Sequence, residues 1–516
     1  MSLLRFSRAA GLMLAPLLVT AWTPAAAISP GQIETALRAE SNSELEAFYR
    51  IGQHRPLWTA GDALRPEALQ LVDILRKSGL DGFTEGAERA ERLQRGIERA
   101  QAGRPHDLAQ AEVLLSLAWI DYVQALRRPA DVGITYIDPS LSPIAPTGRA
   151  ILNAAAAAPS LSRHLDEVSA LNPVYARLRQ GYDEWKARWG DLPRVHIPEG
   201  PALASGSAGE RVQLLRERLG LSSEGSFDAE LASKLKAFKA AHGLEATPVA
   251  DEAAIEALNQ DMAVVERRLR LNLDRARALP AGDRGRFVLV DAASARLYLY
   301  ENGEVRDSMK VIVGKPGEQT PMIAGLIRTT VLNPYWNVPP DLVQRRIAPS
   351  VLKEGAGYLK AKRYEILSDW SEEAKPVDPA TVDWAAVAAG ETELRVRQLP
   401  GAENSMGAMK FMFPNQFGVY LHDTPEKALF ADANRTLSSG CVRVENAARL
   451  ATWLFGKAPR PSTTAPEQAV ALPEPVPVFI NYFTAGWSGD RFALRQDPYG
   501  RDNRIQTASS AQLAAR

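Results

Sequence analysis

The chain has 516 residues, 46% of them hydrophobic, and its 61 Lys and Arg residues balance its 61 Asp and Glu residues to a net charge of zero. This balance excludes the strongly basic surface that nucleic-acid-binding proteins use. A chain of this length exceeds what one hydrophobic core supports, so we expect about three domains. The six histidines are scattered without zinc-ligand spacing, so neither a metal nor another cofactor is expected.

Residues 1–27 have the features of a secretory signal peptide. Two arginines precede an apolar run from about residue 9 to residue 22, and the tripeptide Ala25–Ala27 forms a small-residue cleavage site. The run is shorter than the roughly 20 residues that a spanning helix needs, which favours cleavage over an uncleaved inner-membrane anchor. We therefore expect an exported, periplasmic protein.

Residues 28–200 are expected to form a helical scaffold domain. Several segments, such as RPEALQLVDILRKSGL and DLAQAEVLLSLAWIDYVQALRRP, place apolar residues at three- and four-residue spacing, and Pro, Gly and Asp separate them. No pattern in this region points to chemistry, so a structural role is predicted.

Residues 208–260 are expected to form a compact module of three short helices. Asp228 and Asp251 are placed to cap the second and third helices. Leucines in the first helix, the turn GSFD and a following Gly-Leu resemble the three-helix peptidoglycan-binding module. The resemblance implies a cell-wall ligand, and a helical spacer is the alternative.

Residues 264–505 are expected to form a mostly β domain, which makes the fold class α+β. A leading helix comes first, and from Phe287 the apolar period changes to two around the hairpin signal ENGE. Further strands are expected in LRVRQLP, MKFMFP, GVYLHDTP and PVPVFINYFTAGW, with a helix in NAARLATWLF. Residues 506–516 are expected to be a flexible tail.

The only cysteine of the chain, Cys441, follows the only histidine of this β domain, His422, by nineteen residues. His422 ends a predicted strand, and Cys441 lies in a glycine-containing turn ahead of a helix that Asn446 is placed to cap. In an oxidising compartment, a lone cysteine suggests intermolecular pairing or a reactive thiol. We interpret the pair as nucleophile and general base, and a buried thiol with a structural histidine is the alternative.

Gly440 allows the chain to turn tightly just before the nucleophile. The backbone amides of Gly440 and Cys441 are therefore candidates for an oxyanion hole. Arg443, on the otherwise apolar stretch CVRV, is expected to bind a substrate carboxylate, because a half-buried guanidinium needs an anionic partner. An ion pair with Glu445 or Asp423 is the alternative.

The stretches YLHDTP and LSSGCVRVEN resemble the L,D-transpeptidases of bacterial cell walls, specifically the large periplasmic type with a helical scaffold domain and an inserted peptidoglycan-binding module. VIVGKPGEQTPMIAG, LNPYWNVPP and the terminal YGRDN support the resemblance. One position departs from the family pattern, because Ser439 stands where a second histidine is usual. His422 is then the only imidazole expected at the site.

The resemblance implies that Cys441 attacks the carbonyl that joins the third residue of a donor tetrapeptide stem to its terminal D-alanine. D-Alanine leaves, and the side-chain amine of an acceptor stem resolves the thioester into a cross-link between third residues, with His422 as general base. Tyr420, Ser439 and Asn446 are further candidates for substrate binding. What orients His422 is expected to be a backbone carbonyl, because Asp423 points to the opposite face of a strand.

The expected partners are thus peptidoglycan stem peptides, and other cell-wall synthesis proteins are further candidate partners. The resemblance further implies that residues 341–403, which interrupt the β pattern, form a subdomain that caps the cleft; an insertion without a function is the alternative. Other functions stay open. A carboxypeptidase or endopeptidase would use the same Cys and His, with water in place of the amine, and a wall-binding protein would use the helical module alone.

Overall fold

The computed structural model describes residues 28–40, 42–128, 130–282, 285–488 and 491–502, and these form two compact units. The first unit comprises the described residues up to Arg76, together with Glu85–Asp121 and Thr147–Ser162, and the second comprises the rest. The predicted signal peptide and C-terminal tail lie outside the described residues. The predicted α+β class is confirmed, with helices in the N-terminal region and a mostly β C-terminal domain.

The first unit is helical, with one pair of very short strands. A carboxylate lies in its core: Glu112 is buried and accepts hydrogen bonds from the Tyr49 hydroxyl and the Trp58 amide. These donors compensate for burying the carboxyl group. The elements are α1 (Pro30–Glu40), α2 (Ser43–Ile51), β1 (Thr59–Ala60), β2 (Ala63–Leu64), α3 (Glu67–Lys77), α4 (Gly86–Ala100), the larger part of α5 (Pro105–Arg127) and α6 (Gly148–Ala157).

The second unit includes the helices expected over residues 208–260. The predicted caps are confirmed, because Asp228 accepts from the Leu231 amide at 2.8 Å and Asp251 from the Ala254 amide at 2.9 Å. The helices are α9 (Glu210–Arg218), α10 (Ala229–Ala241) and α11 (Glu252–Asn259). The helices α7 (Leu161–Ala170) and α8 (Pro173–Trp185) precede them in the chain, and α12 (Met262–Arg277) follows them.

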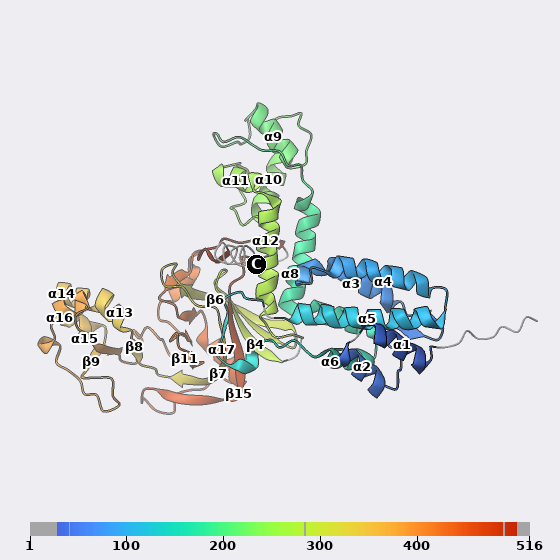
Figure 1. Ribbon diagram of the computed structural model, residues 1–516. Coiled ribbons are helices and arrows are strands. Elements are labelled where there is room, and N and C mark those ends of the chain that lie inside the picture. Colours follow the sequence, from blue (N-terminus) through green and yellow to red (C-terminus); the bar gives the residue numbers. More distant parts are fainter. Residues whose placement is uncertain (1–27, 41, 129, 283–284, 489–490, 503–516) are drawn as a thin grey trace, which may run out of the picture. The chain divides into compact units, whose positions relative to one another are not determined.

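A large sheet forms the centre of the C-terminal domain (Figure 1). Its strand order is β11-β12-β14-β6-β5-β4-β15-β7-β3, and β11 also pairs with β7, so the ladder closes on itself. The strands are β3 (Thr135–Tyr136), β4 (Arg286–Asp291), β5 (Arg296–Glu301), β6 (Glu304–Gly314), β7 (Ile323–Leu332), β11 (Met409–Met412), β12 (Leu421–His422), β13 (Thr436–Ser438), β14 (Val442–Val444) and β15 (Gln468–Asn481), with β13 beside β6.

Alternating residues of these strands face one core, as the period of two predicts. Val288 and Val290 of β4, like Val442 and Val444 of β14, are fully buried in it. Helix α17 (Ala447–Phe455) packs Leu450 against the same core. A hairpin of β16 (Ala485–Ser488) and β17 (Arg491–Leu494) follows β15.

Residues 336–398 form a separate small sheet in the order β8-β10-β9, with its own hydrophobic core (Figure 1). The predicted strand in LRVRQLP, β10, pairs here rather than in the main sheet. The elements are β8 (Trp336–Val338), α13 (Pro340–Leu342), a π-helical turn (Val343–Ile347), α14 (Ala348–Glu354), α15 (Gly357–Ala361), β9 (Tyr364–Leu367), α16 (Trp384–Ala389) and β10 (Arg395–Gln398). The insertion is therefore a packed subdomain.

No helix among the described residues is both long enough and apolar enough to cross a membrane.

Candidate active site

Two short parallel strands bring the predicted site residues together. In the pairing of β12 with β14, Leu421 lies opposite Val442 and His422 lies opposite Arg443. Leu421 and Val442 are fully buried in the core of the sheet. Because side chains alternate along a strand, the residues on either side of them share the other face. These residues are Tyr420, His422, Cys441 and Arg443.

The Cys441 thiol is a hydrogen-bonding partner of its neighbours on this face. Its Sγ donates to the Gly418 carbonyl oxygen at 3.6 Å, and the side chain of Tyr420 also bonds to it. Burial raises the pKa of the thiol, and the Tyr420 hydrogen bonds and the Arg443 charge only partly offset this. The thiol is therefore protonated at neutral pH.

His422 is buried, and its Nδ1 lies 2.6 Å from the Asp423 carbonyl oxygen. A carbonyl can only accept, so Nδ1 carries the proton and Nε2 holds the lone pair. The expected orientation by a backbone carbonyl is thus confirmed. Burial first, and then the Arg443 charge, lower the pKa of His422 to about 3, although hydrogen bonds to the backbone of Asp423 and Ser405 oppose them. The imidazole is neutral at physiological pH.

The turn that carries Cys441, the predicted nucleophile, is fixed by hydrogen bonds. Ser438 Oγ donates to the Cys441 carbonyl at 2.6 Å and accepts from the Gly440 amide at 3.2 Å. Gly440 has a φ of +110°, which a residue with a side chain rarely adopts. Of the two predicted oxyanion donors, the Gly440 amide is thus already engaged within the turn, and the role of the Cys441 amide stays a prediction.

Arg443 pairs with Glu426, a residue that the sequence did not single out. The partners considered from the sequence are used elsewhere: Asp423 pairs with Lys427 at 2.6 Å, and Glu445 accepts from the Lys310 amide at 3.0 Å. The Glu426 carboxylate is largely exposed, whereas the Arg443 side chain is mostly buried. No local sequence pattern connects the pair, because the loop after β12 decides which carboxylate reaches β14.

Ser439 contacts residues outside its own turn. Its hydroxyl accepts from Arg346 of the insertion at 3.2 Å and bonds to Glu318. Glu318 in turn binds Arg345 at 2.6 Å and Lys315 at 3.2 Å. The insertion therefore contacts the nucleophile turn through these polar groups, which sequence reasoning missed.

Local contacts explain the positions of Tyr420 and Asn446. The ring of Tyr420 is 5.7 Å from that of His422, centroid to centroid, in an edge-to-face arrangement. Asn446 accepts from the Arg449 amide at 2.9 Å and caps α17, as predicted. Its further role in substrate binding stays a prediction.

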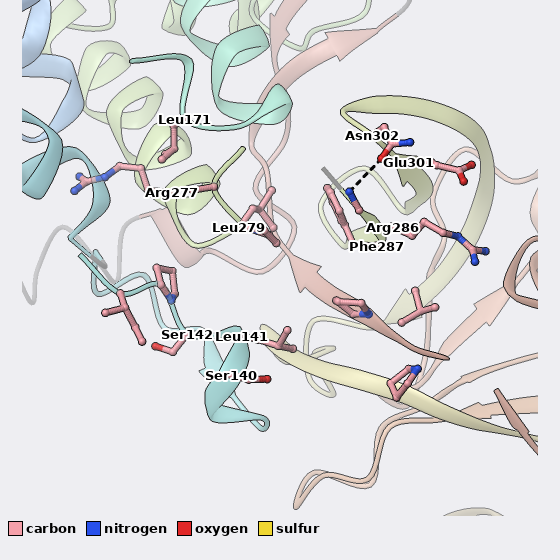
Figure 2. Close-up of a pocket in the computed structure, with 18 of the residues that line it drawn as sticks. Ser140, Leu141, Ser142, Leu171, Arg277, Leu279, Arg286, Phe287, Glu301 and Asn302 are labelled. Atoms are coloured by element: carbon pink, nitrogen blue, oxygen red, sulfur yellow. Dashed lines mark hydrogen bonds between the residues drawn. The ribbon is translucent and has the colours of Figure 1, made fainter. Parts of the chain in front are cut away.

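A cavity of about 700 Å³ lies elsewhere in the second unit and includes none of the predicted site residues. Figure 2 shows Leu141, Leu279 and Phe287 around it, with the guanidinium groups of Arg277 and Arg286 turned away. Arg277 donates to the Leu126 carbonyl, and Arg286 lies over the ring of Trp453. These two arginines are thus engaged in contacts within the fold.

Comparison with known proteins places the site in a catalytic domain. Residues 285–468 match the family model YkuD, the L,D-transpeptidase catalytic domain, and residues 43–181 match a scaffold domain. These two regions are therefore similar to an L,D-transpeptidase catalytic domain and to a scaffold domain.

A curated Haemophilus influenzae protein that bears the name of an L,D-transpeptidase is 34% identical over 251 residues, which are 47% of this chain and 50% of that protein. The chain thus spans about half the length of the curated relative it matches.

Solved structures of an L,D-transpeptidase from Mycobacterium smegmatis and of one from Xylanimonas cellulosilytica align at 14% and 16% identity. They cover 39% and 55% of this chain, and 62% and 99% of their own chains, with TM-scores of 0.20 and 0.17.

Proposed function

We propose that this protein is a peptidoglycan L,D-transpeptidase with Cys441 as its nucleophile. The observation that carries the proposal is the shared face of β12 and β14, where the only thiol of the chain and a buried imidazole lie within the matched catalytic domain. A nucleophile beside a base that is itself oriented by a third group is the common arrangement in covalent catalysis. Here the third group is the Asp423 carbonyl.

The reaction begins from a neutral thiol and a neutral imidazole. As Cys441 Sγ attacks the donor carbonyl, His422 Nε2 takes the thiol proton and then transfers it to the departing D-alanine amine. The acceptor amine attacks the thioester and gives a proton to His422, which transfers that proton to the departing Cys441 sulfur, so the free thiol and the neutral imidazole are restored. Because the pKa of the thiol is raised and that of the imidazole is lowered, proton transfer accompanies the attack and no stable ion pair precedes it.

Arg443 is the candidate for the substrate carboxylate. Its guanidinium is held by Glu426, whose carboxylate faces solvent. A stem-peptide carboxylate can replace Glu426, because the Glu426 carboxylate can return to solvent and the incoming carboxylate restores the charge pair with Arg443. In this proposal Glu426 keeps the guanidinium in place until the donor binds.

The other parts of the chain have proposed roles that fit a peptidoglycan L,D-transpeptidase. The module over residues 208–260 binds the peptidoglycan polymer, and the subdomain inserted at residues 341–403 caps the cleft. The N-terminal 27 residues direct export to the periplasm, where the polymer lies. Cell fractionation that left the mature chain in the cytoplasm would contradict this localisation.

Intact mass spectrometry of the protein mixed with a disaccharide tetrapeptide tests the reaction directly. We expect an adduct equal to the donor minus D-alanine on the parent protein, and none on Cys441→Ala. Muropeptide analysis should then show dimers joined between third residues. An adduct that yields only tripeptide would indicate a hydrolase, and no adduct at all would favour a wall-binding protein.

A further inference from the structure

Thr320 connects two loops behind the nucleophile. Its hydroxyl donates to the Gly440 carbonyl oxygen at 2.7 Å and accepts from the Gly314 amide at 2.8 Å. The Thr320 side chain is fully buried, and both glycines are buried too. A buried hydroxyl that donates on one side and accepts on the other has little freedom to rotate, so it holds the Gly440 carbonyl in one direction.

The direction of this carbonyl determines where the next amide points. The Gly440 carbonyl and the Cys441 N–H belong to one peptide unit, which is planar and trans, so they point in opposite directions. With the carbonyl directed at buried Thr320, the Cys441 N–H points away from Thr320. The Gly440 N–H is bonded to Ser438 Oγ, whereas no hydrogen bond within the described turn engages the Cys441 N–H.

The C-terminal segment holds Thr320 in place. Arg501 donates to the Thr320 carbonyl oxygen at 2.8 Å, and the Tyr499 hydroxyl donates to the Gly314 carbonyl oxygen at 2.5 Å. Both contacts reach the loop over residues 314–320 from outside the nucleophile turn. The hydroxyl of Thr320 therefore has a fixed position relative to Gly440.

We propose that Thr320 is a positioning residue that aims the Cys441 N–H at the oxyanion formed during acylation. The inference rests on the proposed function. When the Cys441 sulfur bonds to the donor carbonyl carbon, the π electron pair moves to the carbonyl oxygen and the thiol proton goes to His422. The Cys441 N–H donates to that oxygen until the pair returns and expels the D-alanine amine, which takes the proton from His422.

The test compares Thr320→Val, which removes the hydroxyl at nearly constant shape, with Thr320→Ser, which keeps it. Thr330→Val is a matched control, because Thr330 is also fully buried and its hydroxyl has no hydrogen-bond partner among the described residues. Two rates are measured by mass spectrometry: thioester formation from the disaccharide tetrapeptide, and alkylation of Cys441 by iodoacetamide. Alkylation displaces iodide at a saturated carbon and develops no oxyanion, so it reports on the thiol alone.

We expect Thr320→Val to form the thioester about a hundredfold more slowly. The alkylation rate of Thr320→Val should remain within about threefold of the parent rate. Thr320→Ser and Thr330→Val should form the thioester within about threefold of the parent rate. Threefold is small compared with the effect of losing an oxyanion donor. Circular dichroism and thermal unfolding establish that each variant is folded. Should the valine variant fail to fold, Thr320→Ala replaces it.

Several outcomes would overturn the inference. Parent-like acylation in Thr320→Val would show that the hydroxyl does not position the donor. Equal losses of acylation and alkylation, or unfolding of both hydroxyl-free variants, would assign Thr320 to the fold instead. If the parent protein itself forms no thioester, the proposed function fails and this inference fails with it.

Discussion

His422 lies opposite Arg443 across the parallel pair of β12 and β14, and the guanidinium charge helps to keep the imidazole neutral. Strand register thus couples these two side chains electrostatically. The neutral form is the one in which Nε2 can accept a proton from the thiol.

Replacement of Arg443 should raise the pKa of His422. Arg443→Met removes the positive charge while keeping an extended apolar stem, so the protonated imidazole becomes less unfavourable. Titration of the His422 ring protons by NMR measures this, with Arg443→Lys as the control that retains the charge. An unchanged titration in Arg443→Met would show that burial alone sets the pKa.

The rate of Cys441 alkylation should keep rising with pH to above pH 9, and it should show no plateau in the acidic range. The reason is that burial raises the pKa of the thiol and His422 is neutral, so no thiolate–imidazolium pair forms at neutral pH. Iodoacetamide rates measured by mass spectrometry are unambiguous, because the chain has one cysteine. His422→Gln should leave this profile nearly unchanged and abolish thioester formation, whereas a plateau between about pH 5 and 7 would indicate a preformed ion pair.

Acid should destabilise the fold through His422. Its pKa is about 3 in the folded state and has the ordinary value of 6.5 when the chain unfolds, so between these values the unfolded state binds one more proton. The neutral imidazole therefore makes its full contribution to the free energy of unfolding above pH 6.5. That free energy falls by about 1.4 kcal/mol for each pH unit below 6.5, down to about pH 3. The free energy of unfolding, measured with denaturant from pH 4 to pH 7, should depend less steeply on pH in His422→Gln than in the parent.

A matched variant separates this effect from other acid titrations. His106 is exposed in the first unit, so His106→Gln should keep the parent pH dependence. Identical slopes for the parent and His422→Gln would contradict the buried neutral imidazole.

Gly440→Ala should destabilise the protein by about 1–3 kcal/mol, because an alanine is strained at a φ of +110°. Space is not the obstacle, since the atoms nearest to an added Cβ are 4.0 Å away. Gly317→Ala is the control, as its φ is not positive and nothing lies within 4 Å. Thermal unfolding of the two variants checks the difference, and equal stabilities would argue against strain at Gly440.

Loss of the Glu318 charge should loosen the contact between the insertion and the nucleophile turn. Burial acts to raise the pKa of Glu318, but hydrogen bonds from Ser439, Arg345 and Lys315 outweigh it and lower the pKa to about 2. Glu318→Gln should therefore increase amide exchange over Val343–Ile347 about fivefold, which corresponds to ~1 kcal/mol for such a pair.

Glu365→Gln is the control for this exchange experiment. Glu365 pairs with Arg397 at 2.6 Å inside the insertion. Glu365→Gln therefore removes one carboxylate charge, as Glu318→Gln does, but at a position away from the contact with the nucleophile turn. We expect parent-like exchange over Val343–Ile347 in this variant. The same increase in both variants would mean that the insertion as a whole had loosened.

The sequence by itself determined those features that depend on local spacing. Alternation of apolar residues indicated the strands, and Asp228 and Asp251 were recognisable as helix caps because capping acts over two or three residues. Cys441 and His422 were conspicuous as the only thiol and the only imidazole of the β domain.

Tertiary structure decided the contacts between distant segments. Thr320 contacts a glycine 120 residues away, and Arg443 pairs with Glu426 instead of Glu445 or Asp423, the two candidates considered from the sequence. Strand register and loop paths set these distances, and many pairings satisfy the same local pattern. The neutral state of the Cys441 and His422 pair likewise follows from burial on a shared face, which no short stretch of sequence contains.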